Sequence, residues 1–262
     1  MRRPPSRVAL SVAMVALAAM GAAIARAEVI QTGVLTVSTT ATMRPQRLPR
    51  TGAAPISVSL AGQISTTDES RPPQLQQLTI GINRNGRLDY QGLPLCKIGQ
   101  IQPASNSRAL AGCRSALVGQ GSFAGAVTLP GTATYPIEGR LLVFNGQEHG
   151  HEVLLGHIFS ATPFATSFVI VFQIAAKHGQ YGTVLTANIA KALGNKRNLT
   201  ALSMTLSRRF SSGGHRHSYI SAGCPAPKGF GSALFPLART SFAFAGGTKL
   251  TSTLTSTCKV RG

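Results

Sequence analysis

The sequence predicts an all-β fold, either an antiparallel β-sandwich with Greek-key-like connections or an open barrel. Three observations support this class. Polar and apolar residues alternate with a period of two in many short segments. Turns rich in glycine, proline and asparagine separate these segments. Helical periodicity is convincing only near residues 107–117.

The expected strands follow from this alternation. In residues 55–64, isoleucine, valine and leucine alternate with serine and alanine, which predicts a strand buried on one side. Asn85-Gly86 and Gly246-Gly247 lie between alternating segments and predict hairpin turns. Residues 168–174 are apolar on both faces, as in a central strand covered on both sides. The expected strands are residues 34–38, 55–64, 76–83, 87–92, 120–129, 134–144, 152–160, 166–175, 182–190, 199–209, 217–223, 240–245 and 249–257.

Two further segments complete the expected architecture. Ser107 is the expected N-cap of at most one short helix over residues 107–117, although Gly112 weakens its helical propensity. Residues 39–54 are expected to form a linker or an edge loop between the first strand and the rest of the domain.

Residues 1–27 have the layout of a secretory signal peptide. Basic residues precede an apolar run of 18 residues, and Ala25-Arg26-Ala27 fits a small-x-small cleavage site. The run approaches the length that spans a bilayer, so an uncleaved N-terminal anchor is the alternative. No later segment is long and apolar enough to be a transmembrane span. We therefore expect an extracellular protein with a single domain over residues 28–262.

Four cysteines behind an export signal predict two disulfides. Three pairings are possible. Cys96 with Cys113 and Cys224 with Cys258 are preferred, because each pair joins cysteines that are neighbours in the sequence. We expect both to be structural staples.

The chain is strongly basic, with 26 Lys and Arg against seven Asp and Glu. Removal of residues 1–27 would leave 22 Lys and Arg and a net charge of +15. Residues 153–262 hold twelve Lys and Arg and no acidic residue. Such a field favours a polyanionic partner, for example an anionic surface polymer. The scattered positions are also typical of arginine-rich proteins from high-GC genomes that bind no anion.

The stretch QEHGHEVLLGH, residues 147–157, is a candidate metal site that its spacing disfavours. His149 and His151 would share one strand face and could bind one ion. His157 lies about 20 Å farther along an extended strand, too far to join them. The glycines instead predict a polar hairpin tip, with His157 in the following strand and satisfied by a neighbour. We therefore expect no metal and no cofactor.

The sequence also contains no recognisable catalytic motif. The basic segment 215–217 offers two histidines, but a catalytic base needs an orienting carboxylate and none lies within sixty residues. A distant Asp68 or Asp89 would have to fold against it. No nucleophile elbow, H-E-x-x-H motif or P-loop occurs. The chain has no Trp and four Tyr, which disfavours aromatic sugar platforms and specific nucleic-acid recognition.

Five segments resemble a family of exported proteins of high-GC soil bacteria, to which no activity is assigned. The segments are LPRTGAAPISVSLAGQI, INRNGRLDYQGLPLC, CRSALVGQG, TLSRRF and SYISAGCPAP. The resemblance covers nearly the whole mature chain, including all four cysteines. It implies export and a single domain, and it implies no catalytic residue.

Together these observations predict a secreted, non-catalytic binding or structural module of unknown ligand, with polyanionic cell-surface material as one candidate. One alternative is an extracellular hydrolase whose histidines and carboxylates converge only in the folded chain. The other is a small-ligand carrier with a cavity between its sheets.

Overall fold

A computed structural model describes residues 27–128, 131, 133–162, 165–194 and 196–261. The expected signal peptide, except Ala27, lies outside the described residues. In the part of the chain that is described, no helix has the length and apolar character needed to cross a membrane.

Strands dominate the structure, as the sequence predicts. One sheet of thirteen strands curls into a half-barrel, and all its pairs are antiparallel except β3 with β18. In sheet order the strands are β1 (Glu28–Thr32), β2 (Leu35–Arg44), β5 (Ser57–Thr66), β13 (Arg197–Leu206), β8 (Leu117–Thr128), β9 (Thr134–Glu148), β10 (His151–Ser160), β11 (Thr166–Ala176), β12 (Tyr181–Asn188), β6 (Leu75–Asn83), β17 (Ser232–Phe244), β18 (Lys249–Val260) and β3 (Arg47–Leu48).

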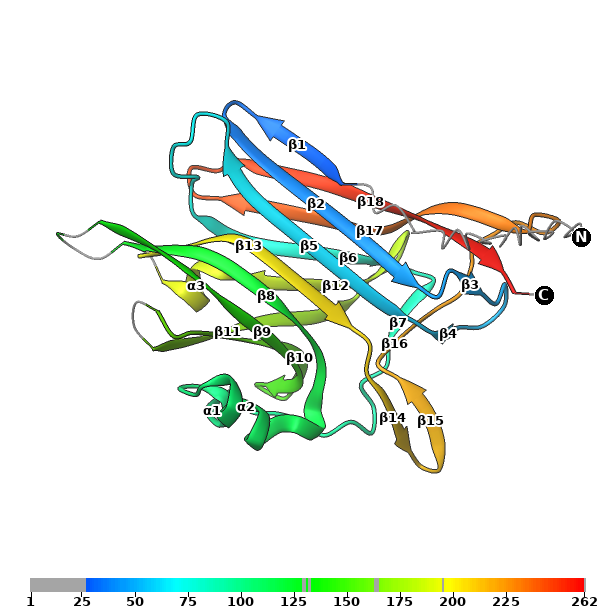
Figure 1. The fold of residues 1–262 in the computed structure, drawn as a ribbon. Coiled ribbons are helices and arrows are strands. Elements are labelled where there is room, and N and C mark those ends of the chain that lie inside the picture. Colours follow the sequence, from blue (N-terminus) through cyan, green and yellow to red (C-terminus); the bar gives the residue numbers. More distant parts are fainter. Residues whose placement is uncertain (1–26, 129–130, 132, 163–164, 195, 262) are drawn as a thin grey trace, which may run out of the picture.

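Two small sheets and four short helical segments complete the fold (Figure 1). Strands β14 (Arg209–Ser212) and β15 (His215–Ser218) form a projecting hairpin, and β4 (Ala54–Pro55), β16 (Ile220–Ala222) and β7 (Gly86–Leu88) form a three-stranded sheet. The helical segments are α1 (Ile98–Ile101), α2 (Asn106–Cys113), the 3-10 turn η1 (Arg114–Ala116) and α3 (Ile189–Leu193).

The curl of the sheet brings strands from its two ends into contact. The hydroxyls of Thr39 in β2 and Ser252 in β18 lie 2.6 Å apart, and Ser252 donates to the Glu28 carboxylate at 2.8 Å. Inside the curl, aliphatic and aromatic side chains from every long strand form the main core. The curl also requires close backbone approach, because a Cβ on Gly121 would lie 1.9 Å from the Ser203 carbonyl oxygen.

A second, smaller core lies on the outer face of β9, β10 and β11, under α1 and α2 (Figure 1). Phe144 and Leu155 of the sheet pack there with Ile101 and Ala109 of the helices, and all four are fully buried. Residues 168–174 belong to β11, where buried side chains point into both cores. The predicted two-sided strand is therefore confirmed.

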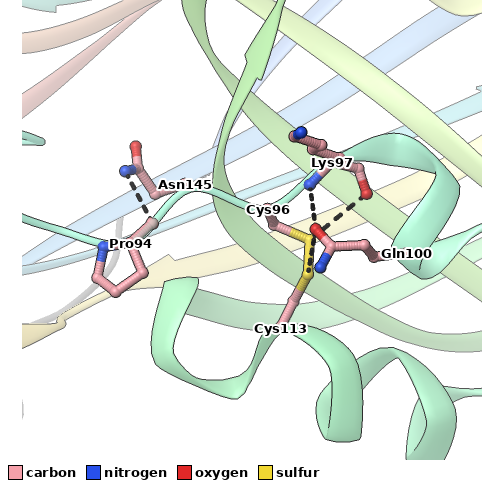
Figure 2. The surroundings of a disulfide bond; sticks show 6 residues. All are labelled: Pro94, Cys96, Lys97, Gln100, Cys113 and Asn145. Carbon is pink, nitrogen blue, oxygen red and sulfur yellow. Dashed lines mark hydrogen bonds between the residues drawn. A yellow bond between two sulfur atoms is a disulfide. The ribbon is translucent and has the colours of Figure 1, made fainter.

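Both predicted disulfides are confirmed. Cys96 pairs with Cys113 at a Cα–Cα distance of 5.6 Å, and Cys224 pairs with Cys258 at 5.7 Å. Figure 2 shows the first disulfide fastening the segment before α1 to the end of α2. The Asn145 side chain donates to the Pro94 carbonyl at 3.3 Å and holds that segment against β9.

The structure corrects several sequence predictions. It does not confirm two separate facing sheets or a Greek-key order, because hydrogen bonding continues from strand to strand around one curl. Residues 39–54 are not simply a linker: β2 extends to Arg44, and β3 and β4 follow. The inward positions of this part of β2 include Thr39 and Ala41, whose weak apolar character hides the alternation.

Local predictions also differ from the structure at helices and turns. The chain holds α1 and α3 besides the one predicted helix, and α2 begins after Ser105, whose hydroxyl accepts from the Arg108 amide at 3.4 Å, so Ser107 is not the cap. The Gly246-Gly247 hairpin joins β17 to β18 as predicted. After Asn85, β7 pairs with β16 instead of folding back on β6.

Candidate functional site

The outer face of β2, β5, β13 and β8 is a hydroxyl-rich surface. Period-two alternation sends aliphatic residues into the core and Ser and Thr outward. Across the strands these hydroxyls pair: Ser59 with Thr205 at 2.8 Å, and Ser122 with Ser203 at 2.8 Å. Because these paired side chains are small, the surface is polar and lies close to the backbone of the sheet. The neighbouring β9–β11 region differs, because helices cover it.

A groove of about 810 Å³ opens on this face where β8 begins and β13 ends. Its residues come from the start of β8, from β9, and from the segment that joins β13 to the β14–β15 hairpin. The backbone of Gly119 and Gly121 borders the groove. Both residues stand opposite the inward-facing Leu206 and Met204, and a Cβ on either would clash with the backbone of β13. These glycines therefore allow β8 and β13 to approach closely beside the groove.

Three exposed arginines line the groove: Arg140 from β9, and Arg208 and Arg209 from the start of the hairpin segment. Arg140 donates to the Gln120 side chain, which directs its guanidinium along the groove wall. Among the described residues, no carboxylate lines the groove. We call this set, with Gln120, Gly119 and Gly121, the arginine groove.

The positive charge of the arginine groove is not neutralised by ion pairs. Among the described residues, one carboxylate lies within 4.0 Å of a basic side chain: Asp89 Oδ2, at 3.0 Å from His217 Nδ1. The guanidinium groups of the arginine groove thus face solvent without an anionic partner from the chain. In a site with few counter-charges, an incoming anion forms charge-assisted bonds with arginine and displaces only water and salt.

The Asp89–His217 pair braces the β14–β15 hairpin, which begins at Arg209. The His217 ring stacks on Phe210 with centroids 5.3 Å apart, and both partners of the Asp89–His217 hydrogen bond are about one-third exposed. Asp89 is one of the two distant carboxylates that sequence analysis named for this segment. In the described part of the chain, no Ser, Thr or Cys side chain hydrogen-bonds to the other ring nitrogen. The pair fixes the hairpin but does not extend into a nucleophile–base–acid chain.

Asp68 has a different local role. Its carboxylate accepts from the Ser70 hydroxyl at 2.6 Å and from the Ser70 amide at 3.0 Å, and these bonds lower the pKa of Asp68. It belongs to the turn after β5 and does not approach residues 215–217 through any hydrogen bond of the described chain.

The histidine stretch forms the predicted polar hairpin tip. His149 and Gly150 form the turn between β9 and β10, with φ values of 50° and 81°. His149 and His151 are exposed, and Glu148 accepts from the Gln173 side chain at 2.7 Å. Among the described residues, no three His, Cys, Asp or Glu side chains gather in a way that could hold a metal ion.

His157 is the strand histidine that the sequence predicts, but a neighbour satisfies only one of its two ring nitrogens. Nδ1 is buried and has no hydrogen-bond partner among the described residues. The His157 ring lies fully buried in β10, and Nε2 is 3.0 Å from the Ala104 carbonyl oxygen between the two helices. Burial lowers the pKa of the imidazole, because a charged ring would lose its hydration. The Ala104 bond requires a proton on Nε2 of the neutral ring, and it ties the helices to the sheet.

The core of the described structure contains two small cavities. Two apolar spaces of about 40 Å³ and about 30 Å³ lie between the curled walls, near Leu60 and Met204. Pockets for small organic ligands are typically about ten times larger. The geometry therefore gives no support to a carrier that encloses its ligand in these spaces.

Comparison of the chain with protein-family models, with curated proteins and with solved structures finds no match. Inference of function therefore depends on the geometry of this chain. Sequence analysis anticipated a basic surface but did not single out Arg140, Arg208 or Arg209. The adjacent pair in TLSRRF at the end of a strand was the available signal, whereas the approach of Arg140 depends on the register between β8 and β9.

Proposed function

We propose that the protein is an exported binding module that holds anionic polymers of the cell surface in the arginine groove. The observation that carries the proposal is the convergence of Arg140, Arg208 and Arg209 on an open groove that no carboxylate lines. The predicted export signal and the two disulfides support an extracellular setting.

The shape of the groove favours a polymer over a small anion. The site is a wide, open trough of about 810 Å³, and Gln120, Thr205 and Ser207 add neutral hydrogen-bonding groups between the arginines. Repeating sulfates, phosphates or carboxylates can contact several arginines at once, and each contact adds to the same binding event. The hydroxyl-rich face beyond the groove continues this polar surface along β13 and β5.

Retention on a heparin column tests the proposal. The variant Arg140→Ser/Arg208→Ser/Arg209→Ser is expected to elute at clearly lower salt than the unaltered protein, because three unneutralised charges are lost from one site. The matched control is Lys177→Ser/Lys191→Ser/Lys196→Ser, which removes the same charge from exposed positions outside the groove. Circular dichroism confirms that both variants fold.

If retention depends only on net charge, the two triple variants will elute together, and that result contradicts a groove-specific site. The hydrolase alternative has a separate test, since Asp89→Asn would abolish any activity that depended on the Asp89–His217 pair. We favour the binding module because that pair braces a hairpin, whereas the arginines face open solvent.

A further inference from the structure

A second surface lies at one end of the molecule, where the start of β17, the end of β18 and β3 lie together near Arg261 (Figure 1). It combines two exposed apolar side chains with a cluster of basic ones. Phe230 is 65% exposed and Leu234 is 70% exposed, the highest values among the large apolar residues of the described chain. We call Phe230, Leu234 and the surrounding residues 226–231 the apolar tip.

The apolar tip is rigid, and its sequence explains why. The Phe230 amide donates to the Pro227 carbonyl at 3.1 Å, closing a β-turn in which Gly229 has a φ of 90°. Glycine is the residue that a turn of this kind requires at its third position. The turn holds Lys228 and Phe230 outward at its corners, where both are exposed.

Arg50 holds the turn in place through hydrogen bonds to three carbonyl groups of the apolar tip. The Arg50 guanidinium donates to the Phe230 carbonyl at 2.7 Å, to the Ala226 carbonyl at 2.6 Å, and also to the Pro227 carbonyl. The Val260 amide donates to the Gly231 carbonyl at 2.8 Å, which fastens the other side of the turn to β18.

The Cys224–Cys258 disulfide completes this support. The Cys224 amide donates to the Pro49 carbonyl at 2.8 Å, so the disulfide, the segment before Arg50 and β18 form one frame. Such a frame presents an aromatic side chain to solvent with little conformational freedom left to lose. Preorganisation of this kind lowers the entropic cost of binding.

Basic side chains surround the apolar tip. Arg47 and Lys259 are register partners in the parallel β3–β18 pair, and both are exposed, as are Lys228 and Arg261. Residues 44–56 and 224–262 contain no Asp or Glu. Leu234 lies on the same face of β17 as Ser232, the residue opposite Lys259, so apolar and cationic groups share one surface.

We infer that the apolar tip docks on anionic phospholipid bilayers, with Phe230 and Leu234 entering the headgroup boundary and the basic residues contacting lipid phosphates. Aromatic and aliphatic side chains flanked by Lys and Arg are the combination that binds an anionic membrane surface. A nucleic acid would use the aromatic ring and the cations but has no comparable use for Leu234, which offers no π face to a base. The inference is independent of the proposed function of the arginine groove.

Co-sedimentation of the exported protein with vesicles tests the inference. We expect binding to vesicles of equal parts phosphatidylglycerol and phosphatidylcholine, and little binding to phosphatidylcholine alone. Phe230→Ser should weaken vesicle binding about tenfold through lost apolar burial. Arg47→Ser and Lys259→Ser should each weaken it about fivefold. Phe230→Ser should leave heparin retention unchanged, which separates this inference from the arginine groove.

Tryptophan fluorescence gives a second readout, because the chain contains no Trp. Phe230→Trp places a single reporter at the apolar tip, and its emission should shift to shorter wavelength when anionic vesicles are added. Leu95→Trp, at a 45% exposed apolar position next to the other disulfide, is the matched control and should not shift. Equal vesicle binding by Phe230→Ser and the unaltered protein would overturn the inference. So would an equal emission shift with soluble inorganic polyphosphate, which would identify a soluble polyanion as the occupant.

Discussion

The outer face of the curled sheet differs sharply between two regions. Over β9, β10 and β11 it is apolar, covered by α1 and α2, and stapled by Cys96–Cys113. Over β2, β5, β13 and β8 it carries Ser and Thr, and no helix covers it in the described structure. The same sheet thus uses one region for stability and leaves the other open, with arginines at the boundary between them.

The difference follows from the pattern of the strands. Where both alternate faces are apolar, the outer face must be buried, and the helical segment 98–116 provides the cover. Where one face carries hydroxyls, water satisfies that face and no cover is needed. The arginine groove lies at the edge of the helical cover, since Leu117 and Val118 follow η1 directly.

The largest expected effect comes from a cavity in the covered region. Phe144→Ala removes a fully buried ring from the second core and should lower the free energy of unfolding by about 3–5 kcal/mol. Thr205→Ala, on the open face, removes one part-buried hydroxyl hydrogen bond and should lower it by about 1 kcal/mol. Urea unfolding followed by circular dichroism measures both. Similar values for the two variants would contradict the division of the sheet into two regions.

Removal of each disulfide should give the second-largest effect on stability, and the two losses should differ. Chain-entropy arithmetic gives about 3 kcal/mol for the 17-residue separation of Cys96–Cys113 and about 4 kcal/mol for the 34-residue separation of Cys224–Cys258. Cys96→Ser/Cys113→Ser should therefore be less destabilising than Cys224→Ser/Cys258→Ser. Hydrogen exchange should also show faster opening of residues 97–116 in the first variant, while heparin retention persists. Loss of heparin retention in that variant would show that the helical cover belongs to the binding surface.

Acidification should lower the free energy of unfolding through His157, by less than the loss of either disulfide. The pKa of His157 is lowered in the folded protein, so between the two pKa values the unfolded chain binds a proton that the folded chain does not. This contribution to stability is complete above about pH 6.5 and declines as pH falls towards the folded pKa, by at most about 1.4 kcal/mol per pH unit. Urea unfolding at pH 7 and pH 5 should show a larger loss for the unaltered protein than for His157→Gln, whose side chain does not titrate. An equal loss in both would exclude His157 as the cause.

Sequence analysis anticipated the local features better than the global ones. Period-two alternation located most long strands, and chain proximity of the cysteines identified both disulfides, because these properties depend on near neighbours. The sequence left a sandwich and an open barrel as alternatives, since alternation does not specify whether strands bond continuously or split into two sheets. The full extent of β2 was missed because Thr39 and Ala41 are weakly apolar.

The residues of the candidate site were harder to predict from the sequence than the strands and disulfides. Arg140 and Arg208 are far apart in the chain and meet only through the register of β8 with both β9 and β13. Asp89 and His217 likewise meet through a fold that places β7 beside β16. The apolar tip had a local signal in the Pro-Lys-Gly-Phe-Gly sequence, but its clamp comes from Arg50, more than 170 residues earlier.

Arginine-selective chemical modification in the presence of heparin tests the central claim most directly. Mass spectrometry after reaction with phenylglyoxal reports the accessibility of each guanidinium. The open face with its groove predicts that heparin protects Arg140, Arg208 and Arg209, while the exposed Arg71 and Arg108 remain reactive. Uniform protection of all exposed arginines, or protection of Arg47 and Arg261 alone, would contradict the arginine groove as the anion-binding site.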